Sequence, residues 1–279
     1  MFNIANLFTA ANMVCGFTSI VLSLFGRIDI APFFILAAAV FDFFDGLIAR
    51  KLNISSELGK QLDSLADMVT FGIAPGVIML VMITLGIDNS SLLPAEDGAR
   101  VYNNDLSYYV YFQITSWIQA LLYSIPNSFD ASIKYLPFVG VFIPFFSMFR
   151  LAKFNIDTNQ SDRFIGVPTP MSTIFFLFFP LYFTSNLNNW GHQPAWILSL
   201  FDCYTLAAIT VGFSLLMVSP ISLIALKFKN YGWADNKFRF LLLGLSLISL
   251  LLLKWWAIPA IVFLYLLLSI IENFSTKKP

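Results

Sequence analysis

Eight long apolar stretches follow one another along almost the whole of this chain. A bilayer with a hydrocarbon core about 30 Å thick needs roughly 20 apolar residues for each transmembrane helix. Only 11% of the residues are charged, against about 25% in an ordinary soluble domain. The sequence therefore predicts an all-α integral membrane protein with about eight transmembrane helices, at roughly 6–26, 29–50, 64–87, 132–154, 168–187, 203–226, 238–254 and 256–273.

The last two stretches are short for a bilayer, and the segment "KWWAIP" from Lys254 to Pro259 separates them. A charge, two tryptophans of the kind found at membrane interfaces and a helix-breaking proline favour a hairpin there. One long tilted helix is the alternative. We expect a membrane domain at 1–226, with an extracytoplasmic insertion at about 88–130, and a C-terminal membrane hairpin at 227–279.

The distribution of lysine and arginine predicts the orientation, because cytoplasmic loops are enriched in both. With a cytoplasmic N-terminus, and with the weaker apolar stretch 106–125 not crossing, 12 of the 16 basic residues lie inside. If 106–125 crossed, nine of those twelve would move outside. We therefore expect 106–125 to be a helix at the outer interface, and the chain to be a multi-pass protein of the plasma (inner) membrane. The first basic residue is Arg27, which favours a retained first helix over a cleaved signal peptide.

Net charge is zero, so nothing in the bulk composition points to nucleic acid. The acids are instead concentrated in "FDFFDGLIARKLNISSELGKQLDSLADMV", residues 41–69. Helical periodicity places one stripe near the end of the second span, consisting of Asp42, Asp45, Gly46, Ala49 and Asn53.

Asp63 and Asp67 are spaced i, i+4 at the start of the third span. A short polar connection makes the second and third spans antiparallel neighbours, so all four carboxylates can converge at the cytoplasmic surface. Four anions so close together require a positive partner, and oxygen ligands favour Mg²⁺, Mn²⁺ or Ca²⁺ over zinc. Paired cations are a recurrent solution for displacement at phosphorus. Arg50 and Lys60 flank the cluster and could neutralise phosphate oxygens.

Other interpretations remain open at this point. A single Asp in a membrane helix can be a structural hydrogen-bonding group, and small residues often mark helix packing. Acids inside helices also line the paths of cation or proton-coupled transporters. A transporter, however, predicts acids near the bilayer midplane, whereas these four gather at one edge.

The spacing Asp42-x2-Asp45-Gly46-x2-Ala49-Arg50-x8-Gly59-x3-Asp63-x3-Asp67 resembles the signature of the CDP-alcohol phosphotransferases. The resemblance implies a six-helix membrane core and a homodimer. It also implies transfer of a phosphoalcohol from a cytidine diphosphate donor to an acceptor hydroxyl, with release of CMP. The four Asp side chains would hold two ions, Mg²⁺ or Mn²⁺, and Asp67 would also be the general base. The donor would be bound by Gly46, Ala49, Arg50 and Gly59, with a contact from Thr9.

Three further segments resemble the bacterial and archaeal phosphatidylserine synthase branch: "NLFTAANMVCGFTSI" at 6–20, "FRLAKFN" at 149–155 and "RFIGVPTP" at 163–170. Lys153 and Val167 depart from that branch, in which we expect Arg and Leu. The resemblance implies CDP-diacylglycerol and L-serine as substrates, with glycerol 3-phosphate or inositol phosphate as alternative acceptors. A guanidinium binds a carboxylate bidentately, so we expect Arg150, and secondarily Arg163, to hold the acceptor. Both could instead be ordinary cytoplasmic anchors.

Overall fold

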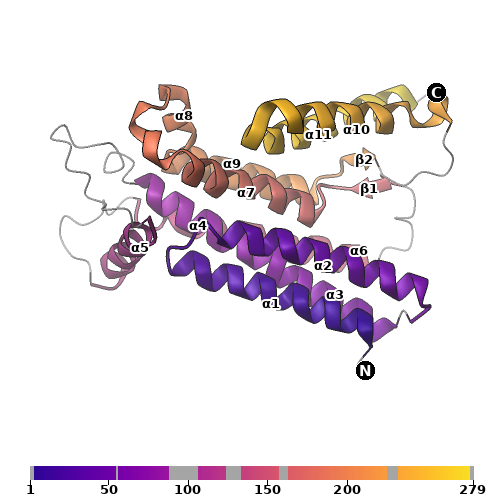
Figure 1. The fold of residues 1–279 in the computed structure, drawn as a ribbon, viewed down its shortest axis with the longest axis horizontal. Helices are drawn as coiled ribbons and strands as arrows, with labels where there is room; N and C mark the ends of the chain where they lie inside the picture. The colour runs from indigo at the N-terminus through magenta and orange to yellow at the C-terminus, as the bar shows by residue number, and fades with distance from the viewer. Residues whose placement is uncertain are drawn as a thin grey trace.

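The computed structural model describes residues 3–54, 56–87, 106–123, 133–156, 163–224 and 232–276, which fold almost entirely into helices (Figure 1). The longer helices are α1 (Ile4–Leu24), α2 (Ala31–Lys51), α3 (Glu57–Asp67), α4 (Ala74–Ile87), α5 (Leu106–Tyr123), α6 (Phe142–Ile156), α7 (Thr169–Ser185), α9 (Cys203–Val218), α10 (Trp233–Leu253) and α11 (Ala257–Thr276). The shorter elements are η1 (Met68–Ile73), η3 (Leu136–Val141), η4 (Leu187–His192), α8 (Ala195–Leu200), η5 (Lys254–Trp256) and the strands β1 (Arg163–Ile165) and β2 (Ser222–Ile224).

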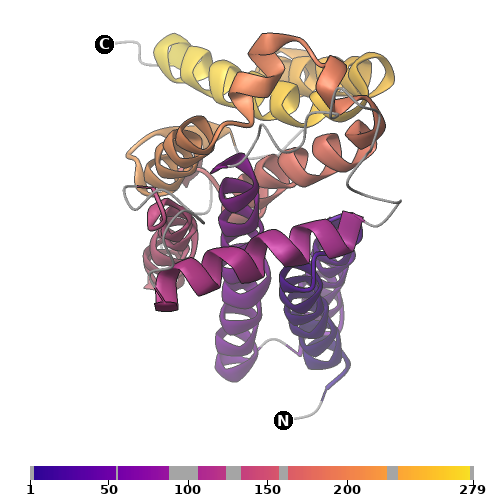
Figure 2. The same cartoon turned by 90° about the vertical axis from the view of Figure 1, so that its left-hand side faces the viewer.

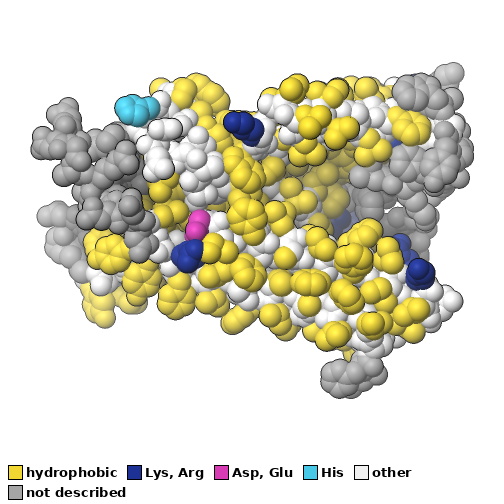
Figure 3. Space-filling view, viewed as in Figure 1, with side chains coloured by type: hydrophobic (Ala, Val, Ile, Leu, Met, Phe, Trp, Pro, Cys, Tyr) yellow, Lys and Arg dark blue, Asp and Glu magenta, His cyan; other side chains and the backbone are white. Residues whose placement is uncertain are grey.

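The architecture is that of a multi-pass membrane protein, as predicted. Seven of the eight apolar stretches coincide with a helix or a continuous run of helical elements. The stretch 203–226 differs, because α9 ends at Val218 and strand β2 follows at Ser222–Ile224. Hydrophobic side chains cover most of the face shown in Figure 3. The described residues contain five helical segments long and apolar enough to cross a membrane: Ile4–Leu24, Ala31–Lys51, Glu57–Ile87, Leu136–Ile156 and Asn236–Ser275.

The central element is the run of α3, η1 and α4, which lies in the middle of the bundle in Figure 2. In its most apolar window 72% of the residues are buried, against 28% for α1 and for α2. Small residues allow neighbouring backbones to approach this run closely, as membrane helices require. A Cβ added to Gly76 of α4 would lie 3.0 Å from the carbonyl oxygen of Gly140 in η3.

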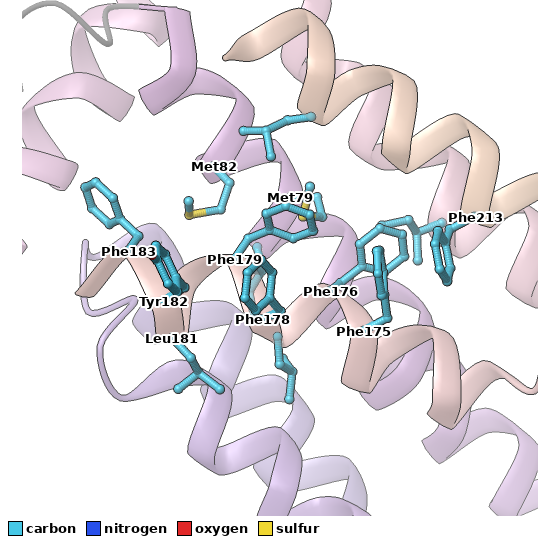
Figure 4. Close-up of a cluster of buried hydrophobic side chains, with 14 of the residues drawn as sticks. Met79, Met82, Phe175, Phe176, Phe178, Phe179, Leu181, Tyr182, Phe183 and Phe213 are labelled. Carbon is cyan, nitrogen blue, oxygen red and sulfur yellow. The ribbon is translucent and has the colours of Figure 1, made fainter. Parts of the chain in front are cut away.

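An aromatic cluster fills the space between α4, α7 and α9 (Figure 4). Nearly every residue of α7 from Phe175 to Phe183 is buried, and a helix that is apolar all round is expected in a core position. The rings of Phe175 and Phe213 stack with their centroids 3.6 Å apart. Met79 and Met82 of α4 fill the remaining gaps against this layer.

Helix α5 runs across the ends of the neighbouring helices rather than parallel to them (Figure 2). Its Trp117 indole donates a hydrogen bond to the Lys134 carbonyl (2.7 Å). This arrangement agrees with the prediction that 106–125 does not cross the membrane. The rest of the predicted insertion, 88–105 and 124–130, lies outside the described residues.

Strands β1 and β2 pair antiparallel, with Phe164 opposite Leu223. This small ribbon joins the segment after α6 to the segment after α9, so both segments lie at the same end of the bundle. The Asn155 amide at the end of α6 donates to the Ser64 hydroxyl of α3 (2.8 Å), and this contact places the acidic helix at that end too. These segments therefore lie together at one end of the bundle.

The C-terminal region is a hairpin, and the alternative of one long helix is wrong. The chain reverses at Lys254, which has φ +50°, and α10 and α11 lie side by side (Figure 1). The segment 188–202 lies between two predicted spans, and its sequence suggests an exposed loop; the structure differs from this expectation. These residues instead include η4 and α8, and Trp190 is buried against Phe183 and Phe201.

Candidate active site

The acids of α2 and α3 lie opposite one another in the second halves of the two helices. One carboxylate oxygen from each of Asp42, Asp63 and Asp67 lies within 4.8 Å of the other two. All three side chains are partly buried. The structure therefore brings together three of the four acids that the helical spacing predicted would converge.

The short connection between α2 and α3 positions the two helices. Helix α2 ends at Lys51, and Asn53 adopts a left-handed conformation with φ +53°, which Asn tolerates better than most residues. Ser56 then caps α3 by accepting a hydrogen bond from the Gly59 amide (3.0 Å). Asn53 thus lies beyond the helix, and the prediction that it shares the acidic stripe is wrong.

Asp45, the fourth acid, lies beside the group of three. Its side chain is 5% exposed and accepts a hydrogen bond from the Thr9 hydroxyl of α1 (2.7 Å). It is close enough to Asp42 and Asp63 for their charges to repel. Thr9 is expected from the sequence to contact the cytidine diphosphate donor. In the structure its hydroxyl also orients the Asp45 carboxylate.

Asn12 of α1 is a site residue that sequence reasoning missed. Its side chain is fully buried, and its amide nitrogen donates to Asp67 Oδ1 (3.2 Å). Asn12 Oδ1 and Asp63 Oδ1 are buried with no hydrogen-bond partner among the residues that the structure describes. Buried acceptors without partners are rare in folded proteins, so both oxygens indicate a missing donor or cation. The only signal in the sequence is a polar residue three positions after Thr9, on the same helix face.

The π-helical segment η1 begins directly after Asp67. Such segments are rare and often occur at functional sites. Two threonine hydroxyls fix it to its neighbours: Thr70 donates to the Asn12 carbonyl (3.1 Å), and Thr173 donates to the Phe71 carbonyl (2.9 Å). The first contact joins Thr70, three residues after Asp67, to Asn12, whose side chain hydrogen-bonds the Asp67 carboxylate.

Arg150 of α6 approaches the cluster from the other side. Its guanidinium is close enough to Asp67 for the charges to attract, and its Nη1 donates to the Thr169 hydroxyl (3.2 Å). Its Nε is buried with no hydrogen-bond partner in the described part of the chain. Arg150 therefore has donor capacity left for a ligand. Arg163 lies in β1, but its side chain is outside the described part.

A cavity of about 530 Å³ opens next to Arg150. Arg150 and Lys153 supply its charged groups, and Phe145, Phe149 and Ile165 are among its apolar walls. Figure 3 shows a hollow between the layer of α10 and α11 and the layer of α2.

The small residues expected to bind the cytidine diphosphate donor differ in how much space surrounds them. A Cβ added to Gly46 would meet no described atom within 4 Å, so a ligand can approach that backbone. At Gly59 it would lie 3.2 Å from the Ser56 hydroxyl. Ala49 lies on the same helix and is half-buried. Arg50 is exposed, and its Nε donates to the Gly46 carbonyl (3.0 Å).

Lys60 is the other cation expected to flank the acids. Its ammonium group forms an exposed ion pair with Glu57 (2.8 Å). Among the described residues, Lys60 is therefore paired with Glu57 and not with the group of three acids.

Comparison with known proteins agrees with this geometry. Residues 2–93, which contain all four acids, match the CDP-alcohol phosphatidyltransferase family. The chain is 30% identical over 217 residues to the CDP-diacylglycerol–serine O-phosphatidyltransferase of Bacillus subtilis, covering 76% of this chain and 85% of that protein. The chain belongs to the CDP-alcohol phosphatidyltransferase family. The resemblance inferred from the acidic motif is thereby confirmed.

Two further relatives in this family extend the comparison. A Helicobacter pylori protein named CDP-diacylglycerol–serine O-phosphatidyltransferase is 28% identical over 269 residues, which are 96% of this chain and 89% of that protein. The archaetidylserine synthase of Methanothermobacter thermautotrophicus is 27% identical over 173 residues, covering 61% of this chain and 54% of that protein.

The donor atoms of the cluster suit the divalent cations that a CDP-alcohol phosphatidyltransferase would use. The group of three consists of carboxylates alone, and hard oxygen ligands are those that Mg²⁺ and Mn²⁺ prefer. The unpartnered Asp63 oxygen and the mutual repulsion of the acids would both be relieved by a bound cation. The residues present therefore fit the cofactor.

Asn12→Ala is expected to lower kcat for CMP release about 10-fold. The substitution removes the donor to a charged Asp67 oxygen, a kind of hydrogen bond that contributes about 1.5–3 kcal/mol. Thr18→Ala, on an exposed site of the same helix whose hydroxyl bonds only the Val14 carbonyl in the described structure, is the matched control. An Asn12→Ala enzyme as fast as the Thr18→Ala enzyme would show that Asn12 does not orient Asp67.

Proposed function

We propose that this protein is a membrane phosphatidyltransferase that makes phosphatidylserine from CDP-diacylglycerol and L-serine and releases CMP. The observation that carries the proposal is the convergence of Asp42, Asp63 and Asp67, with Arg150 beside Asp67. Two relatives that match 76% and 96% of this chain are named for this reaction. The same chemistry with glycerol 3-phosphate or inositol phosphate is the alternative.

The four acids are proposed to hold two divalent cations, Mg²⁺ or Mn²⁺, whose charge would offset that of the donor diphosphate and of the departing CMP. Asp67 is proposed as the general base. The serine hydroxyl oxygen forms a bond to the phosphorus that carries diacylglycerol, and the bond from that phosphorus to the CMP oxygen breaks. The hydroxyl proton passes to the Asp67 carboxylate. The Asn12 amide donates a hydrogen bond to Oδ1 of the same carboxylate and orients it.

The donor and the acceptor are proposed to be bound by different structural elements. The open backbone at Gly46, with Ala49, Gly59, Arg50 and Thr9, would receive the cytidine and its diphosphate. The acyl chains would stay in the bilayer.

Arg150 is proposed to hold the serine carboxylate, with Arg163 in support. Its unpartnered Nε leaves one edge of the guanidinium for bidentate binding. An acceptor that carries a phosphate would need more converging cations than serine does.

The cellular setting is part of the proposal. The excess of lysine and arginine on one side, 12 of 16, favours a cytoplasmic N-terminus and active site in the plasma (inner) membrane. The family resemblance favours a homodimer. We propose that the catalytic unit is 1–226 and that 227–279 is an added membrane hairpin.

Purified protein in lipid-detergent micelles tests the function directly. With CDP-diacylglycerol as donor, labelled L-serine should enter the lipid fraction in equal amount to the CMP released. Glycerol 3-phosphate and inositol phosphate should give CMP only at background rates. EDTA should stop the reaction, and Mg²⁺ or Mn²⁺ should restore it. Efficient transfer to another acceptor but not to serine would refute the serine assignment and keep the reaction class.

A further inference from the structure

Three polar side chains of α11 are bonded along strand β2. The Tyr265 hydroxyl donates to the Ile224 carbonyl (2.8 Å), and the Ser269 hydroxyl accepts from the Ile224 amide (3.1 Å). The Asn273 amide donates to the Ser222 carbonyl (2.5 Å). The three residues are spaced four apart and so lie on one face of the helix.

This polar row is unexpected in a helix that otherwise consists mainly of Leu, Ile and Phe. Polar groups buried in a membrane domain are costly unless they are hydrogen-bonded. Tyr265 is 3% exposed and Ser269 is fully buried. Strand β2 has β1 on one edge, and its other edge would leave backbone groups unpaired. The row on α11 satisfies two groups of Ile224 and one of Ser222 (Figure 1).

The ribbon held in this way forms part of the wall around Arg150. Ile165 of β1 and Ser219, just before β2, line the same cavity as Arg150. The Gly166 amide donates to the Ile221 carbonyl (2.8 Å) and extends the pairing of the two strands. Tyr265 itself lies close enough to Arg150 to interact electrostatically. The helix that fastens the ribbon thus also reaches the residue proposed to bind the acceptor.

We propose that Tyr265 and Ser269, with Asn273, are positioning residues through which the C-terminal hairpin holds the β1–β2 ribbon and Arg150 in the geometry that binds the acceptor. The inference deepens the proposed function, since it assigns to α11 a role in acceptor affinity. This role in acceptor affinity is distinct from the metal binding and proton transfer proposed for the acids of α2 and α3. The hairpin lies outside the residues that match the family.

Tyr265→Phe and Ser269→Ala test the proposal by the KM for each substrate. Each variant removes one hydroxyl, and loss of one neutral hydrogen bond changes an equilibrium about 2- to 10-fold. The KM for L-serine should rise about 3- to 10-fold in each variant, while kcat and the KM for CDP-diacylglycerol stay within about 2-fold. Tyr204→Phe is the matched control, because Tyr204 is exposed at the start of α9.

An unchanged KM for serine, or an equal rise in both KM values, would overturn the proposal. Amide hydrogen exchange provides a readout independent of turnover: the amides of 163–167 and 222–224 should exchange faster in Tyr265→Phe than in Tyr204→Phe, and equal rates would also overturn it. If the wild-type protein transfers to another acceptor, the proposed function fails, and the same KM comparison with that acceptor tests the role of α11 separately.

Discussion

Asp67→Asn is expected to lower the rate of CMP release about 10³-fold. The substitution removes the proposed base and one of three carboxylates that lie within 4.8 Å of one another. Asn has nearly the same shape as Asp, so the protein should still fold. Because like charges repel across the cluster, its Tm measured without divalent cations should equal or exceed that of the wild type.

Asp202→Asn is the matched control for this substitution. Asp202 caps α9 by accepting from the Tyr204 amide (2.9 Å), and Asn caps helices equally well. Its activity should match that of the wild type. A normal rate in Asp67→Asn would remove the general base from the mechanism, and a misfolded Asp67→Asn protein would contradict the expected stability.

Arg150→Lys is expected to raise the KM for L-serine about 10- to 100-fold, and the KM for CDP-diacylglycerol less than about 3-fold. Lysine keeps the positive charge but cannot bind a carboxylate with two parallel hydrogen bonds. Loss of a hydrogen bond between charged groups, at about 1.5–3 kcal/mol, corresponds to a change of this size. Initial rates measured with each substrate varied in turn provide both values.

Arg27→Lys is the control for the loss of a guanidinium. Arg27 pairs with Asp29 (3.0 Å) in the turn between α1 and α2, at the opposite end of α2 from the acids. Equal rises in both KM values for Arg150→Lys would mean that Arg150 has a structural role in the whole site and does not bind the acceptor specifically. An ordinary cytoplasmic anchor would have such a role.

The acids could be predicted because local rules decide their positions. Helical periodicity places Asp63 and Asp67 on one face, and a connection of only a few residues makes α2 and α3 neighbours. The eight apolar stretches were visible for the same kind of reason, since bilayer thickness sets helix length. The distribution of lysine and arginine among the predicted loops then indicated that 106–125 does not cross the membrane. This prediction agrees with the crosswise direction of α5.

The contacts that complete the site could not be predicted because they join residues far apart in sequence. Asn12 reaches Asp67 across 55 positions, and Tyr265 reaches Ile224 across 41. A single polar residue in an apolar helix carries no signal that identifies its partner. The hairpin between α10 and α11 was ambiguous for another reason, since its reversal depends on a positive φ at Lys254, which is uncommon for a non-glycine residue.

The π-helical turn between Asp67 and Ala74 also constrains how this sequence can change. In η1 the Ala74 amide bonds the carbonyl of Val69, five residues back, so the turn accommodates more residues than an ordinary α-helical turn. Each residue of an α-helix advances about 100° around the axis. A single deletion within 68–73 would convert this turn to an ordinary α-helical turn and keep the buried face of α4 oriented relative to Asp63 and Asp67. A single deletion within α3 after Asp63, or within α4, would instead rotate one part against the other by about that angle, so that the acids and the packed interior could no longer both keep their positions.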